Sequence, residues 1–243
     1  LGGTGYVGGI LKGILSSKGH NIEIVGQSTK KNYKIGEEFD ESNLENIDYL
    51  FYLSWMQDTT NKNYQNLNIS SLKDILEKCN RNKIKLIFFS TFYASEDSRS
   101  MYNKTKAMCE KMVISNHQKV VRLGSVIVDG YKLEGFYGKL KNFSQKYKIF
   151  PVILPNKKLF FKTNLNELSK FSDNFENLSD DLNFFCSKKP LDLIEILNID
   201  KNDVRLIPVP WYLIFFLIKF SELIKLNIKF RSDSVLSLSL IHI

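Results

Sequence analysis

A cluster of glycines near the start of the chain restricts the fold more strongly than any other feature of the sequence. Residues 2–9 read GGTGYVGG and contain the spacing Gly2-x-x-Gly5-x-x-Gly8. Glycines at this spacing permit a tight turn and let the backbone approach a pyrophosphate, and a following helix directs its N-terminus at that anion. The sequence therefore predicts that a dinucleotide contacts six residues of the loop: Gly2, Thr4, Gly5, Tyr6, Val7 and Gly8.

Helical stripes and short apolar runs alternate over the first half of the chain. Apolar residues at helical spacing predict three helices, over residues 6–18, 67–79 and 103–115. Continuous apolar runs predict four strands, over residues 22–25, 48–53, 85–89 and 119–123. These runs lack polar alternation, so both faces of each strand should be buried, as in a parallel sheet covered by helices. The pattern predicts an α/β fold with a doubly wound, parallel Rossmann sheet.

The pattern changes after residue 125, where aromatic and irregular segments follow. We expect residues 1–125 to form the dinucleotide-binding domain and residues 126–237 to form a smaller substrate lobe interleaved with it. A Rossmann domain begins with a strand before the glycine loop, and only Leu1 precedes the loop here, so the first strand is expected to be truncated. Residues 238–243 resemble a translated sequencing adapter and are expected to be a non-native scar.

The composition excludes some classes of protein and leaves others open. Hydrophobic residues make up 43% of the chain and charged residues 25%, which is typical of a globular protein with a core. The net charge of +8 comes from scattered basic residues, as at Lys30-Lys31 and Lys188-Lys189. A solvated basic surface explains such scattering better than a nucleic-acid site does, and a positive field also attracts anionic substrates. We therefore expect no nucleic-acid partner.

The cysteines and histidines show no metal-binding pattern. Cys79, Cys109 and Cys186 are odd in number and far apart, and the three histidines form no cluster. This usage is typical of a reducing compartment, so we expect a cytoplasmic protein with no disulfide and no metal.

One apolar run near the end of the chain raises the question of membrane contact. The run from Trp211 to Ile218 is too short to cross a bilayer, which needs about 20 residues. Charged residues follow at helical spacing, at Lys219, Glu222 and Lys225. We expect no membrane span and an amphipathic helix packed on the protein, with membrane-surface contact as the alternative.

The end of the second predicted strand is where dinucleotide-binding folds discriminate between NAD and NADP. An acidic residue there binds a ribose hydroxyl, whereas basic or polar residues accept the 2′-phosphate. Residues 25–31 read VGQSTKK and contain no carboxylate. Gln27, Ser28 and Lys30 could contact a phosphate, so the sequence slightly favours NADP over NAD. The alternative is that they are ordinary loop residues.

Two further elements carry proton chemistry. Tyr102 and Lys106 lie four residues apart on a predicted helix, so they share one face. An ammonium near a phenol lowers the phenol's pKa from about 10 and makes it a usable general acid or base. Thr91, after the strand over 85–89, places a hydroxyl at the end of the sheet where ligands bind. Taken alone, this spacing is common, and it favours two surface residues on a helix over a catalytic pair.

Together, in this order, these elements resemble the extended short-chain dehydrogenases, the group of nucleotide-sugar epimerases, dehydratases and reductases. The glycine loop matches that family, and Thr91, Tyr102 and Lys106 match its Ser/Thr-Tyr-Lys triad. Residues 47–54 resemble its fourth strand, which ends beside the cofactor at Leu53 and Ser54. Residues 122–126 resemble the segment near the nicotinamide, which implies cofactor contacts at Gly124 and Ser125.

The resemblance implies a role for each member of the triad. Tyr102 would take the proton from a sugar hydroxyl, Lys106 would lower the pKa of Tyr102 and hold the nicotinamide ribose, and Thr91 would bond the same hydroxyl. The dehydratases carry an Asp-Glu pair after their threonine, whereas this chain has Phe92-Tyr93. That departure argues against a 4,6-dehydratase.

The sequence therefore favours an NAD(P)-dependent epimerase or reductase that acts on a nucleotide sugar, with a role in surface polysaccharide synthesis by analogy. The alternative is a non-catalytic sensor or scaffold that binds NADP. Relatives form dimers through helices that flank the site, so a homodimer through the predicted helices 67–79 and 103–115 is possible.

Overall fold

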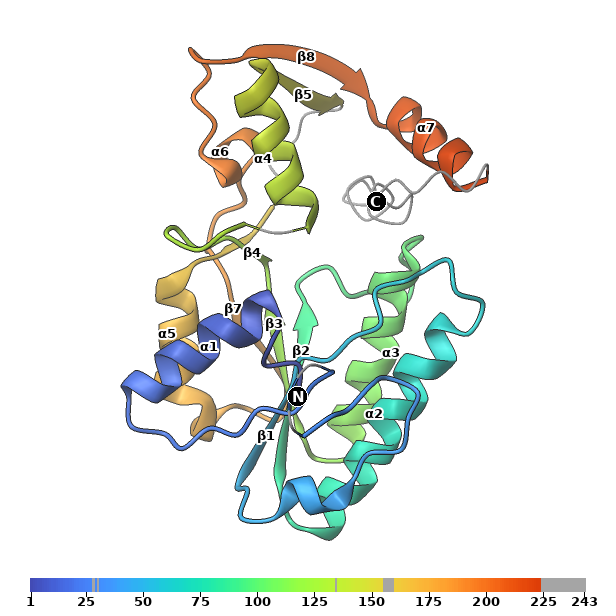
Figure 1. Cartoon of the computed structure of the whole chain (residues 1–243), viewed down its shortest axis with the longest axis vertical. Helices are drawn as coiled ribbons and strands as arrows, with labels where there is room; N and C mark the ends of the chain where they lie inside the picture. The colour runs from blue at the N-terminus through green and yellow to red at the C-terminus, as the bar shows by residue number, and fades with distance from the viewer. Residues whose placement is uncertain (28, 30, 134, 155–159, 224–243) are drawn as a thin grey trace.

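A four-stranded parallel sheet forms the centre of the computed structural model, which describes residues 1–27, 29, 31–133, 135–154 and 160–223 (Figure 1). The strand order is β1-β2-β3-β7. In sequence these strands are β1 Tyr49–Tyr52, β2 Lys85–Thr91, β3 Lys119–Leu123 and β7 Leu182–Phe185. Parallel register holds throughout, with Leu50 opposite Leu86, and Val120 opposite Leu182. The predicted parallel Rossmann sheet is confirmed, and the strand predicted over 119–123 is found with those bounds.

Helices cover both faces of the sheet (Figure 1). Helices α1 (Tyr6–Ser17) and α5 (Leu165–Asn174) pack on one face, where Ile10, Leu11 and Phe171 join one buried cluster. Helices α2 (Tyr64–Arg81) and α3 (Met101–Ser115) pack on the other face, with Leu72, Ile75 and Val113 in a second cluster. The three helices predicted in the first half of the chain are thus present.

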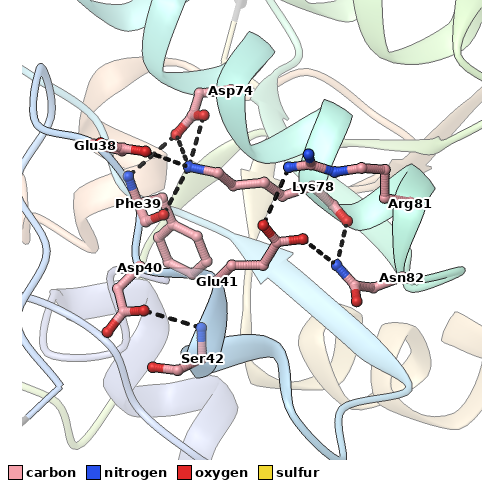
Figure 2. Close-up of polar contacts among 9 residues, drawn as sticks. All are labelled: Glu38, Phe39, Asp40, Glu41, Ser42, Asp74, Lys78, Arg81 and Asn82. Carbon is pink, nitrogen blue, oxygen red and sulfur yellow. Dashed lines mark hydrogen bonds and ion pairs between the residues drawn. The ribbon is translucent and has the colours of Figure 1, made fainter.

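The irregular segment before β1 is fixed to α2 by a polar network (Figure 2). Lys78 donates to the carbonyl of Phe39 at 2.7 Å and pairs with Asp74 at 2.8 Å. Asp74 also accepts from the Phe39 backbone N–H at 3.1 Å. The short helix η1 (Glu41–Leu44) follows, and Glu41 contacts Arg81 and Asn82. These bonds anchor a loop that has few ladder hydrogen bonds of its own.

The strand predicted over 22–25 is wrong in extent. Only Val25 forms a bridge, with Lys31, while the rest of that run is not in a strand. Leu1 and Gly2 lie between Val25 and the end of β1. On the β1 side, the amino group of Leu1 donates to Phe51 O at 2.7 Å and Leu53 N donates to Leu1 O at 2.9 Å. On the other side, Gly2 N donates to Val25 O at 3.0 Å.

The remaining elements form a lobe beside the carboxyl ends of the strands (Figure 1). It contains the paired strands β5 (Ile149–Leu154) and β8 (Arg205–Pro210), with helices α4 (Gly135–Tyr147), α6 (Leu193–Leu197) and α7 (Trp211–Leu223). A third buried cluster lies here, including Phe150, Ile194 and Ile196. Short strands β4 (Ser125–Val126) and β6 (Lys162–Thr163) pair where the lobe meets the core. After β6, the chain returns to the core for α5, the short helix η2 (Phe175–Asn177) and β7.

Helix α7 forms where the apolar run predicted a helix, but the expected packing of that run is wrong. Phe216, Leu217 and Leu223 are 64%, 71% and 78% exposed. The described element that α7 contacts most is β8. Within the described residues, no helix is both long enough and apolar enough to cross a membrane. Residues 224–237 and the suspected scar at 238–243 lie outside the described residues.

Candidate cofactor and catalytic site

The glycine loop between Leu1 and α1 has no space for side chains at two of its glycines. A Cβ on Gly2 would lie 2.7 Å from Ser54 N, and Gly2 also has φ of +78°. A Cβ on Gly8 would lie 2.5 Å from Gly2 O and 2.6 Å from Gly3 Cα. Both neighbours are backbone, which cannot move aside cheaply. These two glycines therefore close the turn tightly enough to bring its backbone against the end of β1.

The start of α1 is open to an anion. Gly5 is the N-cap residue, so no side chain caps the first N–H groups of the helix. A Cβ on Gly5 would meet only Gly2 O, at 3.4 Å, which is an ordinary contact. The exposed Thr4 lies near Gly26, whose added Cβ would be 3.4 Å from Thr4 Oγ1. A free helix N-terminus over a glycine turn is the arrangement that binds phosphate through backbone N–H groups.

Four other predicted cofactor residues lie around this turn, with different roles. Leu53 and Ser54 follow β1 and contact Gly2 through their backbone. Tyr6 Oη accepts a hydrogen bond from Val128 N at 3.2 Å, so this ring reaches the start of the lobe. Val7 packs against the apolar cluster beneath α1. Leu53 and Ser54 thus lie beside the loop, whereas Tyr6 and Val7 have structural contacts of their own.

The segment expected to choose between NAD and NADP is only partly described. Gln27 is exposed, and Ser28 and Lys30 lie outside the described residues. Thr29 closes the turn, since its hydroxyl donates to Gly26 O and lies 3.1 Å from Gly26 N. Lys31 pairs with Glu23. The preference for NADP therefore stays a prediction.

Thr91 and Tyr102 occupy the carboxyl end of β2 and the first turn of α3. Thr91 is the last residue of β2 and is half-buried, and its hydroxyl accepts from Tyr93 N at 3.3 Å. Helix α3 begins after Ser100, whose side chain caps it by accepting from Asn103 N. Tyr102 is therefore the second residue of the helix, at the end nearest the carboxyl edge of the sheet (Figure 1).

Lys106 lies one turn further along α3 and is 4% exposed. Its Nζ donates to the carbonyl of Phe89 at 2.7 Å, which ties α3 to β2 two residues before Thr91. The same Nζ lies 6.0 Å from the centroid of the Tyr102 ring. The triad residues are thus brought to one end of the sheet: Lys106 adjoins Tyr102 directly and reaches the strand that carries Thr91.

The electrostatics differ from the expectation for this pair. Burial raises the pKa of Tyr102 from 10.0 to about 12. Burial also lowers the pKa of Lys106 from 10.5 to about 7, and the nearby Cys109 and Glu110 offset this only in part. The predicted lowering of the Tyr102 pKa by Lys106 is not found in this arrangement. The burial of Tyr102 is the main influence on its pKa, and the Lys106 ammonium donates its hydrogen bond to Phe89 O.

Two groups beside the triad were not predicted as site residues. Trp55, just after Ser54, places its ring over the Lys106 ammonium at 3.8 Å. Arg122 on β3 makes a two-pronged ion pair with the buried Glu110 and donates to Ala94 O at 3.0 Å. That pair ties α3, β3 and the turn after Thr91 together. Glu110 follows Lys106 by four residues, a spacing that could have indicated a shared buried face.

Gly124 and Ser125 serve the crossing from core to lobe. A Cβ on Gly124 would lie 2.1 Å from Phe161 O, so only glycine fits there. Gly124 N donates to Thr163 Oγ1 at 2.8 Å, and Ser125 N donates to Phe161 O at 2.7 Å. The Ser125 hydroxyl shares a 2.6 Å hydrogen bond with Tyr137. These contacts explain both residues structurally, so their contact with a cofactor stays a prediction.

Aromatic rings occupy the place where the dehydratases would carry an acid and a base. Phe92 stacks on Phe161 with centroids 4.0 Å apart, and Tyr93 Oη accepts from Phe161 N at 3.0 Å. Burial raises the pKa of the Tyr93 phenol.

Among the residues that the structure describes, no group of three or more His, Cys, Asp or Glu side chains could hold a metal ion.

No protein-family model matches the chain, and no curated protein matches it by sequence. Solved structures do match. TunA, an NAD-dependent NDP-hexosamine 5,6-dehydratase involved in tunicamycin biosynthesis, gives a TM-score of 0.69 at 19% identity, covering 86% of this chain and 83% of that one. The ADP-L-glycero-D-manno-heptose-6-epimerase of Helicobacter pylori gives 0.67 at 17%, with the same coverage. L-threonine dehydrogenase from Phytophthora infestans gives 0.68 at 13%, again with the same coverage.

At these identities the likeness establishes the fold. The chain has an α/β Rossmann fold similar to that of this NAD-dependent dehydratase and this epimerase, which is the fold that the motifs predicted. A threonine dehydrogenase has a similar fold, so the fold alone does not choose the substrate.

Proposed function

We propose that the chain is an NAD(P)-dependent epimerase or reductase that acts on a nucleotide sugar. The observation that carries this proposal is the pairing of Tyr102 with the buried Lys106 on α3, beside the strand that ends at Thr91. The glycine loop lies at the same edge of the sheet and contacts Ser54. A hydride carrier and a proton carrier could therefore act on one carbon–oxygen group.

The loop fits a dinucleotide by its shape. The space that a Cβ would take at Gly2 and Gly8 is filled by backbone, and the N-terminus of α1 has no side-chain cap. Backbone N–H groups there would hold the pyrophosphate. A bound nicotinamide supplies a site that accepts or returns a hydride. Four of the matching solved structures are named with NAD, whereas the slight preference for NADP rests on the sequence of Gln27, Ser28 and Lys30 alone.

The proton step falls to Tyr102. With its pKa raised to about 12, the phenol is protonated at neutral pH and can donate to the oxygen of a keto sugar, which is the reductive direction. In the oxidative direction the phenolate would take the hydroxyl proton, which requires a nearby positive charge to lower the pKa of Tyr102. Thr91 Oγ1 would bond the same substrate oxygen, and Lys106 would hold the ribose of the cofactor.

The first test is a titration with NAD(H) and NADP(H), followed by turnover of UDP- and dTDP-sugars. We expect Tyr102→Phe to abolish turnover and to leave cofactor affinity within about twofold, since only a hydroxyl is removed. Gly5→Ala should fold, because its methyl group meets only one atom of the protein, at 3.4 Å. It should weaken cofactor binding, because the methyl group would lie where the pyrophosphate approaches the backbone of the loop. Turnover that survives in Tyr102→Phe would remove the catalytic assignment.

A non-catalytic sensor or scaffold of the same fold is the second candidate. The observation that favours it is the engagement of Lys106 by Phe89 O and Trp55, which leaves the pKa of Tyr102 raised instead of lowered. This candidate predicts cofactor binding without turnover of any sugar nucleotide. Cofactor binding in the first titration would therefore be common to both candidates, and turnover would decide between them.

Three further aspects of the proposal concern setting and assembly. The free thiols of Cys79 and Cys109 are buried, which suits a reducing cytoplasm.

A homodimer would use the outer faces of α2 and α3. On α3, Met101 and Met108 are 41% and 37% exposed. Light scattering on the purified protein tests this assembly. Surface polysaccharide synthesis is the pathway class that such a substrate implies.

A further inference from the structure

Lys106 is enclosed by aromatic rings. Its Nζ lies 3.8 Å from the centroid of the Trp55 ring and 4.5 Å from that of Phe88. Its hydrogen bond to Phe89 O accounts for one of its three protons. Within the described part of the chain, no carboxylate lies at ion-pair distance from it. The face of an aromatic ring carries negative potential, and among aromatic side chains indole attracts cations most strongly. Trp55 therefore takes the place of a counter-ion here.

Trp55 is itself held in place from α2. Its Nε1 donates to Tyr64 Oη at 2.8 Å. The next residue, Met56, donates from its N–H to Asn68 Oδ1 at 3.0 Å, and Asn68 is fully buried. Both the ring and the backbone beside it are thus fixed to the same helix.

The same ring also contacts the phenol. The Trp55 and Tyr102 rings are 6.0 Å apart at an interplanar angle of 83°, an edge-to-face contact. One indole therefore faces both members of the Tyr–Lys pair, and it lies directly after Ser54, at the end of β1 next to the glycine loop.

We propose that Trp55 is a positioning residue for this site, whose ring face holds the ammonium of Lys106 and whose edge contact orients Tyr102. The proposal rests on the proposed function where it concerns turnover, but the contact between ring and ammonium can be tested without it. Loss of the ring face should free the ammonium and disfavour its charged form, because burial would then be less compensated.

The other ionisable groups around Lys106 do not obscure this effect. Tyr102 and Cys109 lie on the same helix, and the pKa of each is raised to about 12. Glu110 is bound to Arg122 from β3. From α2, Tyr64 faces Trp55 through its hydroxyl. The pKa of Lys106 itself is lowered to about 7 by burial, so its charge changes in an accessible pH range.

The chain has two tryptophans, which makes the contact visible by fluorescence. Trp211 lies on α7 in the lobe, so the full-length Trp211→Phe protein reports Trp55 alone. We expect its emission to change between about pH 6 and 8 as the ammonium over the ring is lost. The change should vanish when Lys106→Met is added. Emission that is flat with pH, or a titration that persists without Lys106, would overturn the proposal whatever the protein's activity.

A second measurement follows Lys106 directly by NMR of lysine labelled at its ε-carbon. Trp55→Leu should lower the pKa of Lys106 by about one unit, and Trp55→Phe by less, because a phenyl face is retained. Tyr64→Phe is the matched control, because it removes the hydrogen bond from Trp55 Nε1 and keeps the indole. It should lower the pKa of Lys106 by less than Trp55→Leu does. An equal pKa in the wild type and Trp55→Leu would contradict the proposal. A shifted pKa in a protein that turns over no sugar would uphold it and remove the proposed function instead.

Discussion

Two lysines are buried on neighbouring helices of the same face of the sheet, and their surroundings are opposite in kind. Lys78 on α2 is 6% exposed and Lys106 on α3 is 4% exposed. Lys78 lies among carboxylates, with Asp74 at 2.8 Å and Glu38 at 3.8 Å, and it bonds the carbonyl of Phe39 (Figure 2). Lys106 bonds one carbonyl and faces aromatic rings.

The difference separates a structural lysine from a candidate working one. Carboxylates compensate the buried charge of Lys78, and this side chain holds a loop to its helix. Lys106 has its pKa lowered to about 7, so it can gain or lose a proton near neutrality, as a group at a site of proton chemistry must. Burial alone did not distinguish the two, whereas the partners did.

The largest expected effect is the loss of turnover in Lys106→Met. Under the proposed function Lys106 assists proton transfer and binds the ribose, so its removal should lower kcat/KM by about 10²- to 10⁴-fold. The folded protein should be as stable as the wild type or more so, because a buried charge without a carboxylate partner is replaced by an apolar chain of similar length. Steady-state kinetics and urea unfolding measure both. A strongly destabilised Lys106→Met would mean that Lys106 resembles Lys78.

The next effect is on stability and concerns Lys78→Met. This change removes the donor to Phe39 O and leaves Asp74 without its closest cation, so we expect a loss of about 1–3 kcal/mol in the free energy of unfolding. Turnover per folded molecule should not change, because the network lies on the loop before β1. Reduced kcat at full folding would contradict the structural role.

A smaller effect is the pH dependence of stability that Lys106 confers. Its pKa in the folded state is about 7, below its ordinary value of 10.5, so the unfolded chain binds more protons between these values and stability rises with pH. Between pH 7 and 8.5 the gain should be about 1 kcal/mol per pH unit. Unfolding curves of Lys106→Met, measured in parallel, should lack this slope, while Lys78→Met should keep it.

The smallest expected effect is that of Asp74→Asn. Lys78 keeps Phe39 O and can approach the exposed Glu38, and an amide can still accept from Phe39 N. We expect a loss of about 0.5–1 kcal/mol in the free energy of unfolding. A loss as large as that of Lys78→Met would show that Asp74 is the one partner that matters.

Local patterns predicted the sheet and its helices well, because those elements depend on spacing. The run over 119–123 became β3 without change, and the stripe after the glycine loop became α1. The strand over 22–25 was wrong in extent, because Val25 alone is paired, in a bridge with Lys31. Helix α7 formed as expected, yet its apolar face is exposed, since local pattern does not determine what covers a helix.

The sequence predicted which elements carry Thr91, Tyr102 and Lys106, but not the contacts around them. The four-residue spacing placed Tyr102 and Lys106 on one face of α3. It could not predict that the ammonium bonds Phe89 O, or that Trp55 lies over it, because these partners come from segments 17 and 51 residues away in sequence. The lowered pKa of Lys106 follows from those long-range contacts.

The crossing at Gly124 has a consequence for how such a chain could diversify. The chain leaves the core after β4 and returns at β6, and these strands are paired with each other. The second departure, at Ser187, is bonded to Lys162 at the same place. The first excursion into the lobe thus starts and ends at paired strands, and the second starts at the same place. The segment between β4 and β6 can therefore be lengthened or exchanged while the seam of Gly124, Thr163 and Ser187 stays constant, and under the proposed function this would change the substrate lobe without changing the glycine loop.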